Sequence, residues 1–227
     1  MFREALTYPG RADEETLLAG AALAVAAGLF ARLGALAVLA VPAVVLLAGY
    51  ALAVIRTTAQ GAAEPPAFAD LRTLARDGAR ALAVAVGYLL VPGLALGVTL
   101  DGAAAAGRPE TPATSVFVFG AGTALLFVSA GLAYLLPAAL AATAERRSLR
   151  GALDSSALRT GATDGGYFVA WTFALILLAV GGTAGFALAG LGRVGELVGL
   201  AVGAYALVAV ARLAGLGARA AGGVDRR

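Results

Sequence analysis

Cysteine and histidine are both absent from this chain of 227 residues. Without cysteine there are no disulfide bonds and no thiol nucleophiles, and without histidine there is no imidazole acid–base chemistry. Together the two absences exclude zinc fingers and remove the commonest metal ligand. We therefore expect no metal centre and no cofactor. Lysine is missing too, so all seventeen basic residues are arginines, a bias typical of a GC-rich genome.

Charged and aromatic residues are scarce, at 14% and 7%, whereas 60% of the chain is hydrophobic and the mean hydropathy is +0.87. Soluble domains contain about 25% charged residues and about 45–50% apolar ones, so this composition indicates a membrane protein. The net charge of +3 does not predict nucleic-acid binding, because arginines gathered on one side of a membrane protein explain it.

Six apolar stretches are long enough to cross about 30 Å of hydrocarbon as helices. They are residues 15–31, 34–55, 81–100, 114–136, 167–191 and 197–216. Acidic residues Asp13, Glu14 and Glu15 precede the first stretch where a secretory leader would be basic, so we expect the first helix to stay attached. We predict an all-α, polytopic bundle of six transmembrane helices in three hairpins. Its domain is 17–216, with an N-terminal segment 1–16 and a flexible tail 217–227.

Arginines are unevenly divided between the two sides of this predicted arrangement. Fourteen of the seventeen lie in the N-terminal segment, the two long loops and the C-terminal part; the other three are Arg32, Arg108 and Arg193. Loops rich in arginine stay in the cytoplasm. We therefore expect the cell membrane as location, with both termini cytoplasmic.

The two long loops contain segments with the spacing of amphipathic helices, 67–80 and 148–159. In the first, Pro65-Pro66 ends the preceding span, and the apolar face opposes an arginine at every fourth position. We predict that both segments lie in the cytoplasmic interface, although solvated connectors with local helix remain the alternative. The expected headgroup contacts are Arg56, Phe68, Arg72, Arg76, Arg80, Arg146, Arg147 and Arg150.

Glycines and aromatic residues suggest how the spans pack. Small residues at four-residue spacing allow close helix contact, within the chain or in a dimer. Such pairs are found at Gly93 and Gly97 and at Gly195, Gly199 and Gly203. Pro42, Pro92 and Pro137 fall inside predicted spans and should kink them. As interface anchors we expect Tyr50, Tyr134, Tyr167 and Trp171.

Several of these residues match a known family pattern. The matching residues are Tyr8-Pro9 followed by acids, Gly20, Gly49-Tyr50, Arg56, Thr57, Gly61, Pro65-Pro66, Phe68, Asp70, Leu74, Asp77-Gly78, Tyr134, Pro137-Ala138-Ala139, Tyr167 and Trp171. The chain resembles the archaeal and bacterial integral membrane family called domain of unknown function 4013. It departs from the pattern at Thr16 and Leu71, where the family has tryptophan. The resemblance implies a six-helix membrane protein and no particular activity.

Three classes of function remain to be weighed. No predicted span has an acid in its interior, and the polar cluster formed by Arg72, Asp77, Arg80, Arg146, Arg147 and Asp154 is explained by charges at the inner leaflet, so we expect no enzyme. Thr123, Ser129, Thr172 and Thr183 could line a path between kinked helices in an uncoupled transporter, channel or lipid-flux protein, but such hydroxyls also bond to their own helix.

The sequence favours a non-catalytic membrane scaffold, assembly or membrane-organising module, with a transport function as the alternative. The expected partners are membrane lipids and an unidentified membrane or cytoplasmic protein, with no nucleic acid. A homo-oligomer is compatible with the glycine pattern but has no further support.

Overall fold

The computed structural model describes residues 1–105 and 112–222, and all regular structure within them is helical. The all-α fold class is confirmed, and six of the described helical segments are long and apolar enough to cross a membrane. The elements are α1 (Phe2–Thr7), η1 (Pro9–Arg11), α2 (Glu14–Ala31), η2 (Gly34–Leu39), α3 (Ala40–Ala59), α4 (Leu71–Ala105), α5 (Pro112–Arg146), η3 (Leu149–Leu153), α6 (Ser155–Thr163), α7 (Gly165–Ala189) and α8 (Arg193–Gly222).

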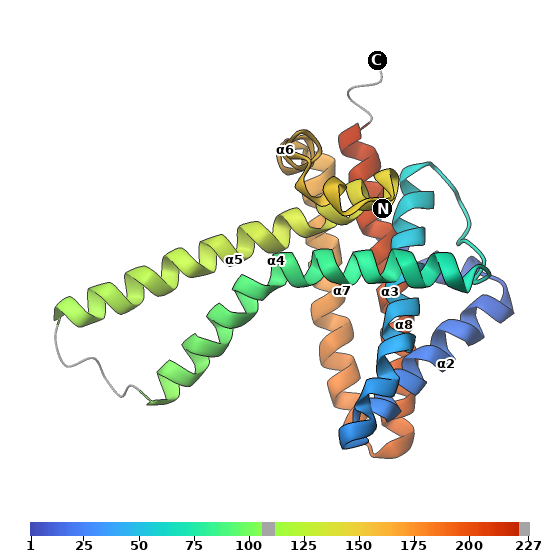
Figure 1. Cartoon of the computed structure of the whole chain (residues 1–227), viewed down its shortest axis with the longest axis horizontal. Coiled ribbons are helices and arrows are strands. Elements are labelled where there is room, and N and C mark those ends of the chain that lie inside the picture. Colours follow the sequence, from blue (N-terminus) through green and yellow to red (C-terminus); the bar gives the residue numbers. More distant parts are fainter. Residues whose placement is uncertain (106–111, 223–227) are drawn as a thin grey trace.

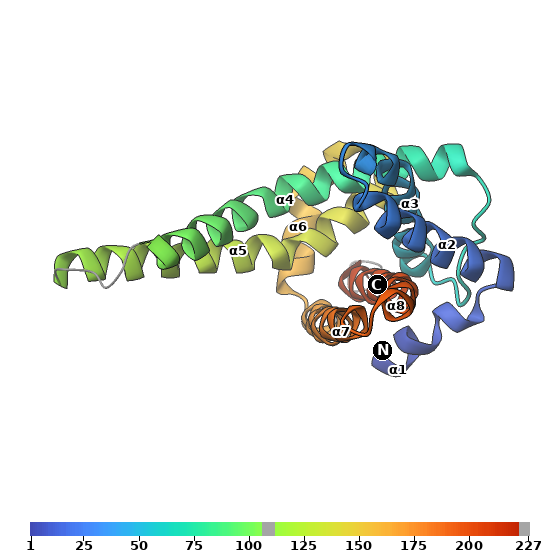
Figure 2. The same ribbon diagram turned by 90° about the horizontal axis from the view of Figure 1, so that it is seen from below.

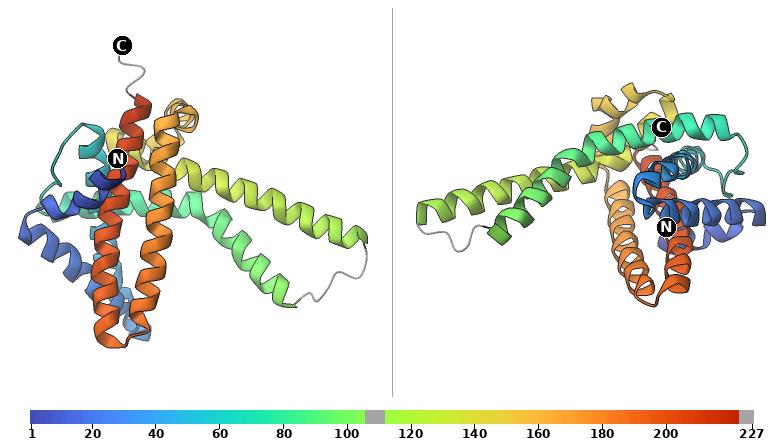
Figure 3. Two further views of the ribbon diagram at one scale, coloured as in Figure 1. Left: turned by 180° about the vertical axis from the view of Figure 1, so that it is seen from behind. Right: turned by 60° about the horizontal axis from the view of Figure 1, so that its bottom comes forward.

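The helices form an upright group and a lateral hairpin. Helices α3, α7 and α8 stand side by side, and α2 leans against them (Figure 1). Helices α4 and α5 cross this group and then extend far to one side. In Figure 2, which looks along α7 and α8, helices α4 and α5 are therefore seen along their full length. Both views in Figure 3 show the same upright group with the α4–α5 hairpin extending to one side. The far part of the hairpin exposes large apolar side chains such as Leu94 and Phe127.

Polar residues and glycine determine where several helices begin and end. The carboxylate of Asp70 accepts a hydrogen bond from the N–H of Thr73 at 3.1 Å, which caps the first turn of α4. Asp164 caps α7 in the same way through the N–H of Tyr167, at 2.7 Å. At the end of α2 the chain turns at Gly34, whose φ of 58° is readily adopted only without a Cβ.

The structure differs from the sequence prediction at the first amphipathic segment. Instead of a separate interfacial helix over 67–80, α4 runs without a break from Leu71 to Ala105. No proline interrupts the helix before Pro92, so α4 can continue through the arginine-rich part. The arginine pattern marks the place where the surroundings of this one helix change, and not a helix boundary. Its first part lies across α3, where Leu74, Ala81 and Val84 are buried.

Three further boundaries also differ. The segment predicted as one helix over 148–159 is divided into η3 and α6, because Asp154 is extended and caps a new helix. Residues 217–222 continue α8 as helix and are not a flexible tail, and residues 223–227 lie outside the described part. The first turns of the predicted span 34–55 form η2. The predicted outer connection at Arg108 also lies outside the described residues.

Two glycines allow α3 and α4 to cross in close contact. A Cβ at Gly49 would collide with the backbone carbonyl of Leu74, and a Cβ at Gly78 would collide with that of Val45. Of the glycines predicted to pack, Gly195 and Gly199 lie against α7. At Gly93, Gly97 and Gly203 a Cβ would meet nothing within 4 Å, so none of these three forms a close helix contact among the described residues.

Pro137 breaks the hydrogen-bond ladder of α5, and α7 repairs it. Proline has no N–H, so the carbonyl of Ala133 loses its helical donor, and the indole N–H of Trp171 takes that place at 3.2 Å. One step along, the Tyr167 hydroxyl donates to the Tyr134 carbonyl at 2.5 Å and accepts from the Ala138 N–H at 3.1 Å. An uninterrupted helix would join those two groups directly. Unsatisfied backbone groups are costly in hydrocarbon, so this repair fixes α7 against α5.

This repair predicts coupling between Pro137 and Trp171. Trp171→Phe should lower the free energy of unfolding by about 1–2 kcal/mol, because it leaves the Ala133 carbonyl without a donor. In a Pro137→Ala background, residue 137 supplies its own N–H to the Ala133 carbonyl. There Trp171→Phe should lower the free energy of unfolding by clearly less. Unfolding of the four purified variants in detergent measures the cycle. Equal costs in both backgrounds would contradict the assignment.

Candidate functional site at the arginine-rich end

The guanidinium of Arg212 in α8 is buried at one end of the molecule, where it binds groups from several segments. This end, where α3 and α8 finish and α7 begins, is called the arginine-rich end below (Figure 1). Arg212 is only 3% exposed. Its Nη2 donates to the Glu4 carboxylate at 2.6 Å, and its Nη1 donates to the Ala62 carbonyl at 2.6 Å and the Thr58 hydroxyl at 3.1 Å.

The ring of Tyr8 completes the surroundings of Arg212. The guanidinium carbon lies 4.3 Å from the ring centroid, in cation–π geometry. Tyr8 is itself fully buried, and its hydroxyl donates to the Glu64 carbonyl at 3.1 Å. One side chain of the last helix therefore ties down both the N-terminal segment and the loop after α3.

The tyrosines repeat this use of a hydroxyl to bind a loop or helix end. Each of the six tyrosine hydroxyls donates to a backbone carbonyl oxygen. The acceptors are Glu64 for Tyr8, Pro66 for Tyr50, Ala152 for Tyr88, Ala162 for Tyr134, Tyr134 for Tyr167 and Leu6 for Tyr205. Because four of the six bonds join a candidate membrane helix to a loop or short helix outside the spans, they hold these segments in fixed positions.

Asp77 forms a second buried ionic group where α4 crosses α3. The residue is 2% exposed, and its two carboxylate oxygens each accept a bond of 2.9 Å, one from Arg56 and one from Arg80. Since α4 is continuous, Asp77 belongs to the candidate span 71–95. The predicted span 81–100 did not include Asp77, because the sequence prediction began this span ten residues later than α4 begins. With two arginines on one carboxylate, the group keeps one positive charge.

A polar cavity of about 690 Å³ lies between α3, α5, α6 and α8. One arginine from the second helix of each hairpin lines it, namely Arg56, Arg146 and Arg219. Asp154 pairs with Arg146. The pKa of Asp154 lies below its ordinary value, mainly because the Ser156 hydroxyl donates a hydrogen bond to the carboxylate. Among the described residues, no ion pair is formed by Arg219. The remaining polar lining includes Gln60, Glu145, Ser156 and Thr160.

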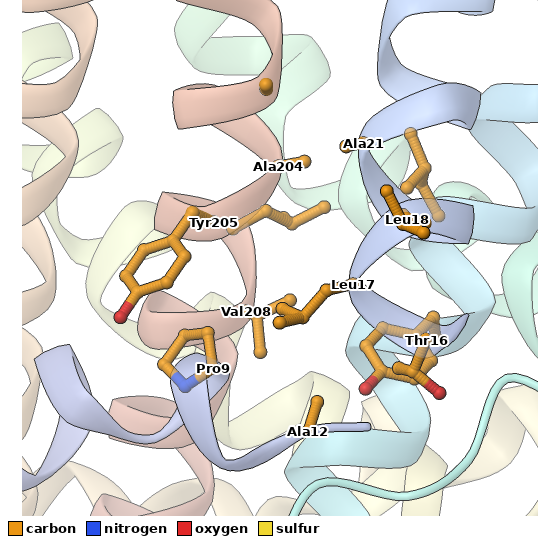
Figure 4. Close-up of a pocket in the computed structure, with 14 residues that line it drawn as sticks. Pro9, Ala12, Thr16, Leu17, Leu18, Ala21, Ala204, Tyr205 and Val208 are labelled. Carbon is orange, nitrogen blue, oxygen red and sulfur yellow. The ribbon is translucent and has the colours of Figure 1, made fainter. Parts of the chain in front are cut away.

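An apolar cleft of about 280 Å³ lies between α2 and α8 (Figure 4). Leu17 and Val208 point toward each other across it, and Pro9 and Ala12 of the N-terminal segment close one end. The same segment is held by Arg212 through Glu4. Both walls belong to candidate spans, so a hydrocarbon chain is the chemically matched neighbour of this surface.

Several expected surface contacts are turned inward. Arg56 and Arg80 each donate to Asp77, and Phe68 packs on Tyr50 with ring centroids 5.2 Å apart. Tyr50 and Tyr167 are buried, so they do not anchor the chain at a lipid interface. Tyr134 and Trp171 are half-buried against α7 and α5. Arg72, Arg76, Arg147 and Arg150 are exposed, as a headgroup contact requires, and Arg146 is exposed while paired to Asp154.

Sequence reasoning did not single out Glu4, Thr58, Arg212 or Arg219 as site residues, and it named Tyr8 only as part of the family pattern. One signal was present: Arg212 lies inside the predicted span 197–216, and an ionisable residue inside a span marks a functional or structural site by default. Its partners could not be identified in this way, because Glu4 lies 208 positions earlier in the chain.

The family model described as "Protein of unknown function (DUF4013)" matches residues 33–190, more than two thirds of the chain. The chain belongs to this family. Within the DUF4013 match lie the α3–α4 crossing, the Asp77 group and the Pro137 repair; Tyr8-Pro9, Gly20 and Arg212 lie outside it. No curated protein and no solved structure matches the chain.

The contact between Glu4 and Arg212 predicts acid release of the N-terminal segment. The hydrogen bond from Arg212 is the main cause that holds the pKa of Glu4 below its ordinary value. A lowered carboxyl pKa stabilises docking above the unfolded-state pKa of about 4.3, and this contribution is lost as pH falls through the folded-state value. Glu4→Gln should therefore loosen residues 2–12 at neutral pH, as acid does in the unmodified protein.

Amide hydrogen exchange of residues 2–12, corrected for the pH dependence of the exchange reaction, measures this release. Glu15→Gln, which removes an exposed carboxylate from the start of α2, is the matched control and should exchange like the unmodified protein. Unchanged exchange in Glu4→Gln at neutral pH would show that the bond does not hold the segment.

Proposed function

We propose that the protein is a non-catalytic membrane module with a scaffold, assembly or membrane-organising role. The observation that supports this most is that the buried ionic groups and the tyrosine hydroxyls are committed to contacts within the chain. Asp77, Arg212 and all six tyrosine hydroxyls are bound by other parts of the protein. A carrier needs polar groups that are free to exchange partners with its substrate.

The threonines that could line a transport path support the same proposal. The hydroxyl of Thr172 donates to the carbonyl of Phe168, and that of Thr183 donates to Ala179, both at 2.9 Å within their own helix. Of the other candidates, Ser129 favours the alternative of an uncoupled transporter, channel or lipid-flux protein. Its buried hydroxyl has no hydrogen-bond partner among the described residues.

Two surfaces support membrane lipids as partners. The lateral hairpin exposes Leu90, Leu94 and Phe127, and the cleft between α2 and α8 is lined by apolar side chains. Exposure of such surfaces to water costs free energy, whereas contact with hydrocarbon does not. A partner protein in the membrane or the cytoplasm is the assembly form of the same proposal.

The arginine-rich end is proposed to face the cytoplasm, with both termini there and the protein in the cell membrane. The support is the division of arginines: fourteen belong to segments assigned to this side, and the tight turn between α7 and α8 lies at the opposite end (Figure 1).

A flux assay distinguishes the scaffold from the transporter. In proteoliposomes containing the purified chain, passage of small solutes and scrambling of labelled lipids should not exceed the rates of protein-free vesicles. Flux that is well above that background and that Ser129→Ala abolishes would overturn the proposal. Thr183→Ala is the matched control, because its hydroxyl already bonds to its own helix.

The orientation can be tested with single cysteines, since the chain has none of its own. Leu191→Cys lies exposed in the turn between α7 and α8, and Ala67→Cys lies exposed in the loop before α4. A membrane-impermeant maleimide should label residue 191 on intact cells and residue 67 only after permeabilisation. The reverse pattern would contradict the proposed topology.

A further inference from the structure

We propose that the polar cavity at the arginine-rich end binds a phosphate-bearing anion. The inference goes beyond the proposed function and does not depend on it, since a scaffold or a carrier could hold such an anion. The cavity of about 690 Å³ falls within the range of small-molecule sites, roughly 300–1,000 Å³. Its walls combine alanines from α3, α5 and α8 with charged and amide side chains.

Donors for an anion come from the ends of two helices, α3 and α8, that meet at this space. Each guanidinium carries five N–H groups in a planar fork that suits phosphate oxygens. The bond to Asp77 uses Nη1 of Arg56, which leaves other donors of that group available. Arg219 forms no ion pair within the described part of the chain, and its guanidinium lies beside Gly61, where a Cβ would be 3.5 Å from its Nη1. Gln60, next to Gly61, adds an amide to the same wall.

The balance of charges leaves the cavity positive. Asp77 neutralises one of its two arginines, and Asp154 neutralises Arg146. Glu145 also lines the cavity, but it is exposed and can turn its carboxylate into solvent. Arg219 and one charge of the Arg56 group therefore remain for an anion. The hydroxyls of Ser156 and Thr160 add no donors, because both already donate to oxygens of Asp154 and Ser156.

The phosphate can come from two sources, a lipid headgroup or a free phosphorylated solute. The cavity lies where α5 and α8 reach the end of the upright group, which is the level at which headgroups meet a spanning helix. An opening to solvent would admit a soluble phosphate at the same place. Both sources present the same oxygens to Arg56 and Arg219.

Binding by the purified full-length chain in detergent tests the inference with two probes. Native mass spectrometry measures retention of phosphatidylglycerol, and calorimetry measures binding of inorganic phosphate. Arg219→Gln should lower the affinity for the bound probe about tenfold, because a charge-assisted hydrogen bond is lost. The matched control, Arg76→Gln, removes an exposed arginine of α4 that does not line the cavity and should leave binding unchanged.

Selective retention of the lipid would assign the site to a headgroup, and binding of phosphate alone would assign it to a soluble ligand; either result supports the inference. Failure of both probes to bind at millimolar concentration would overturn it. Equal weakening by Arg219→Gln and Arg76→Gln would also overturn it, since only the overall charge would then matter. Both variants change exposed residues, and their melting temperatures confirm folding.

Discussion

A guanidinium that cannot reach water must find its partners inside the protein, and Arg212 imposes this requirement on the whole arginine-rich end. Removing one partner of a buried charge costs about 3–5 kcal/mol in other proteins, so such a group strongly constrains what surrounds it. Here the partners come from α1, from the end of α3 and from the loop that follows it. The positions of these three segments therefore follow from one side chain of α8.

The same constraint applies to the backbone wherever a helix is interrupted. Hydrocarbon offers no hydrogen bonds, so every carbonyl freed by a turn or a proline needs a donor from the protein. With no lysine and no histidine, the chain supplies these donors from arginine, tyrosine and its one tryptophan. The repair beside Pro137 shows the principle most clearly, because the residues that close the gap in α5 also determine how α7 packs.

Composition and hydropathy were sufficient to predict six apolar helices, because the cost of placing a residue in hydrocarbon depends mainly on that residue. The contacts of the site were not predictable in the same way, since Glu4 and Arg212 or Tyr8 and Glu64 are joined only by the tertiary fold. The evenly spaced arginines of α4 were misleading. A change of charge along the sequence suggested a break, whereas the backbone continues and turns Asp77 toward Arg56 of α3, with Arg80 of α4 paired to the same carboxylate.

The distance in sequence between Glu4 and Arg212 has a consequence for how the protein is made. A chain emerges from the ribosome beginning with its N-terminus, and the guanidinium that receives Glu4 belongs to the final membrane helix. The α1 turn that carries Glu4 therefore cannot dock until all six candidate spans that follow it have been made. Docking of that segment is therefore a late event in folding, because it needs the side chain of Arg212 in the sixth candidate span.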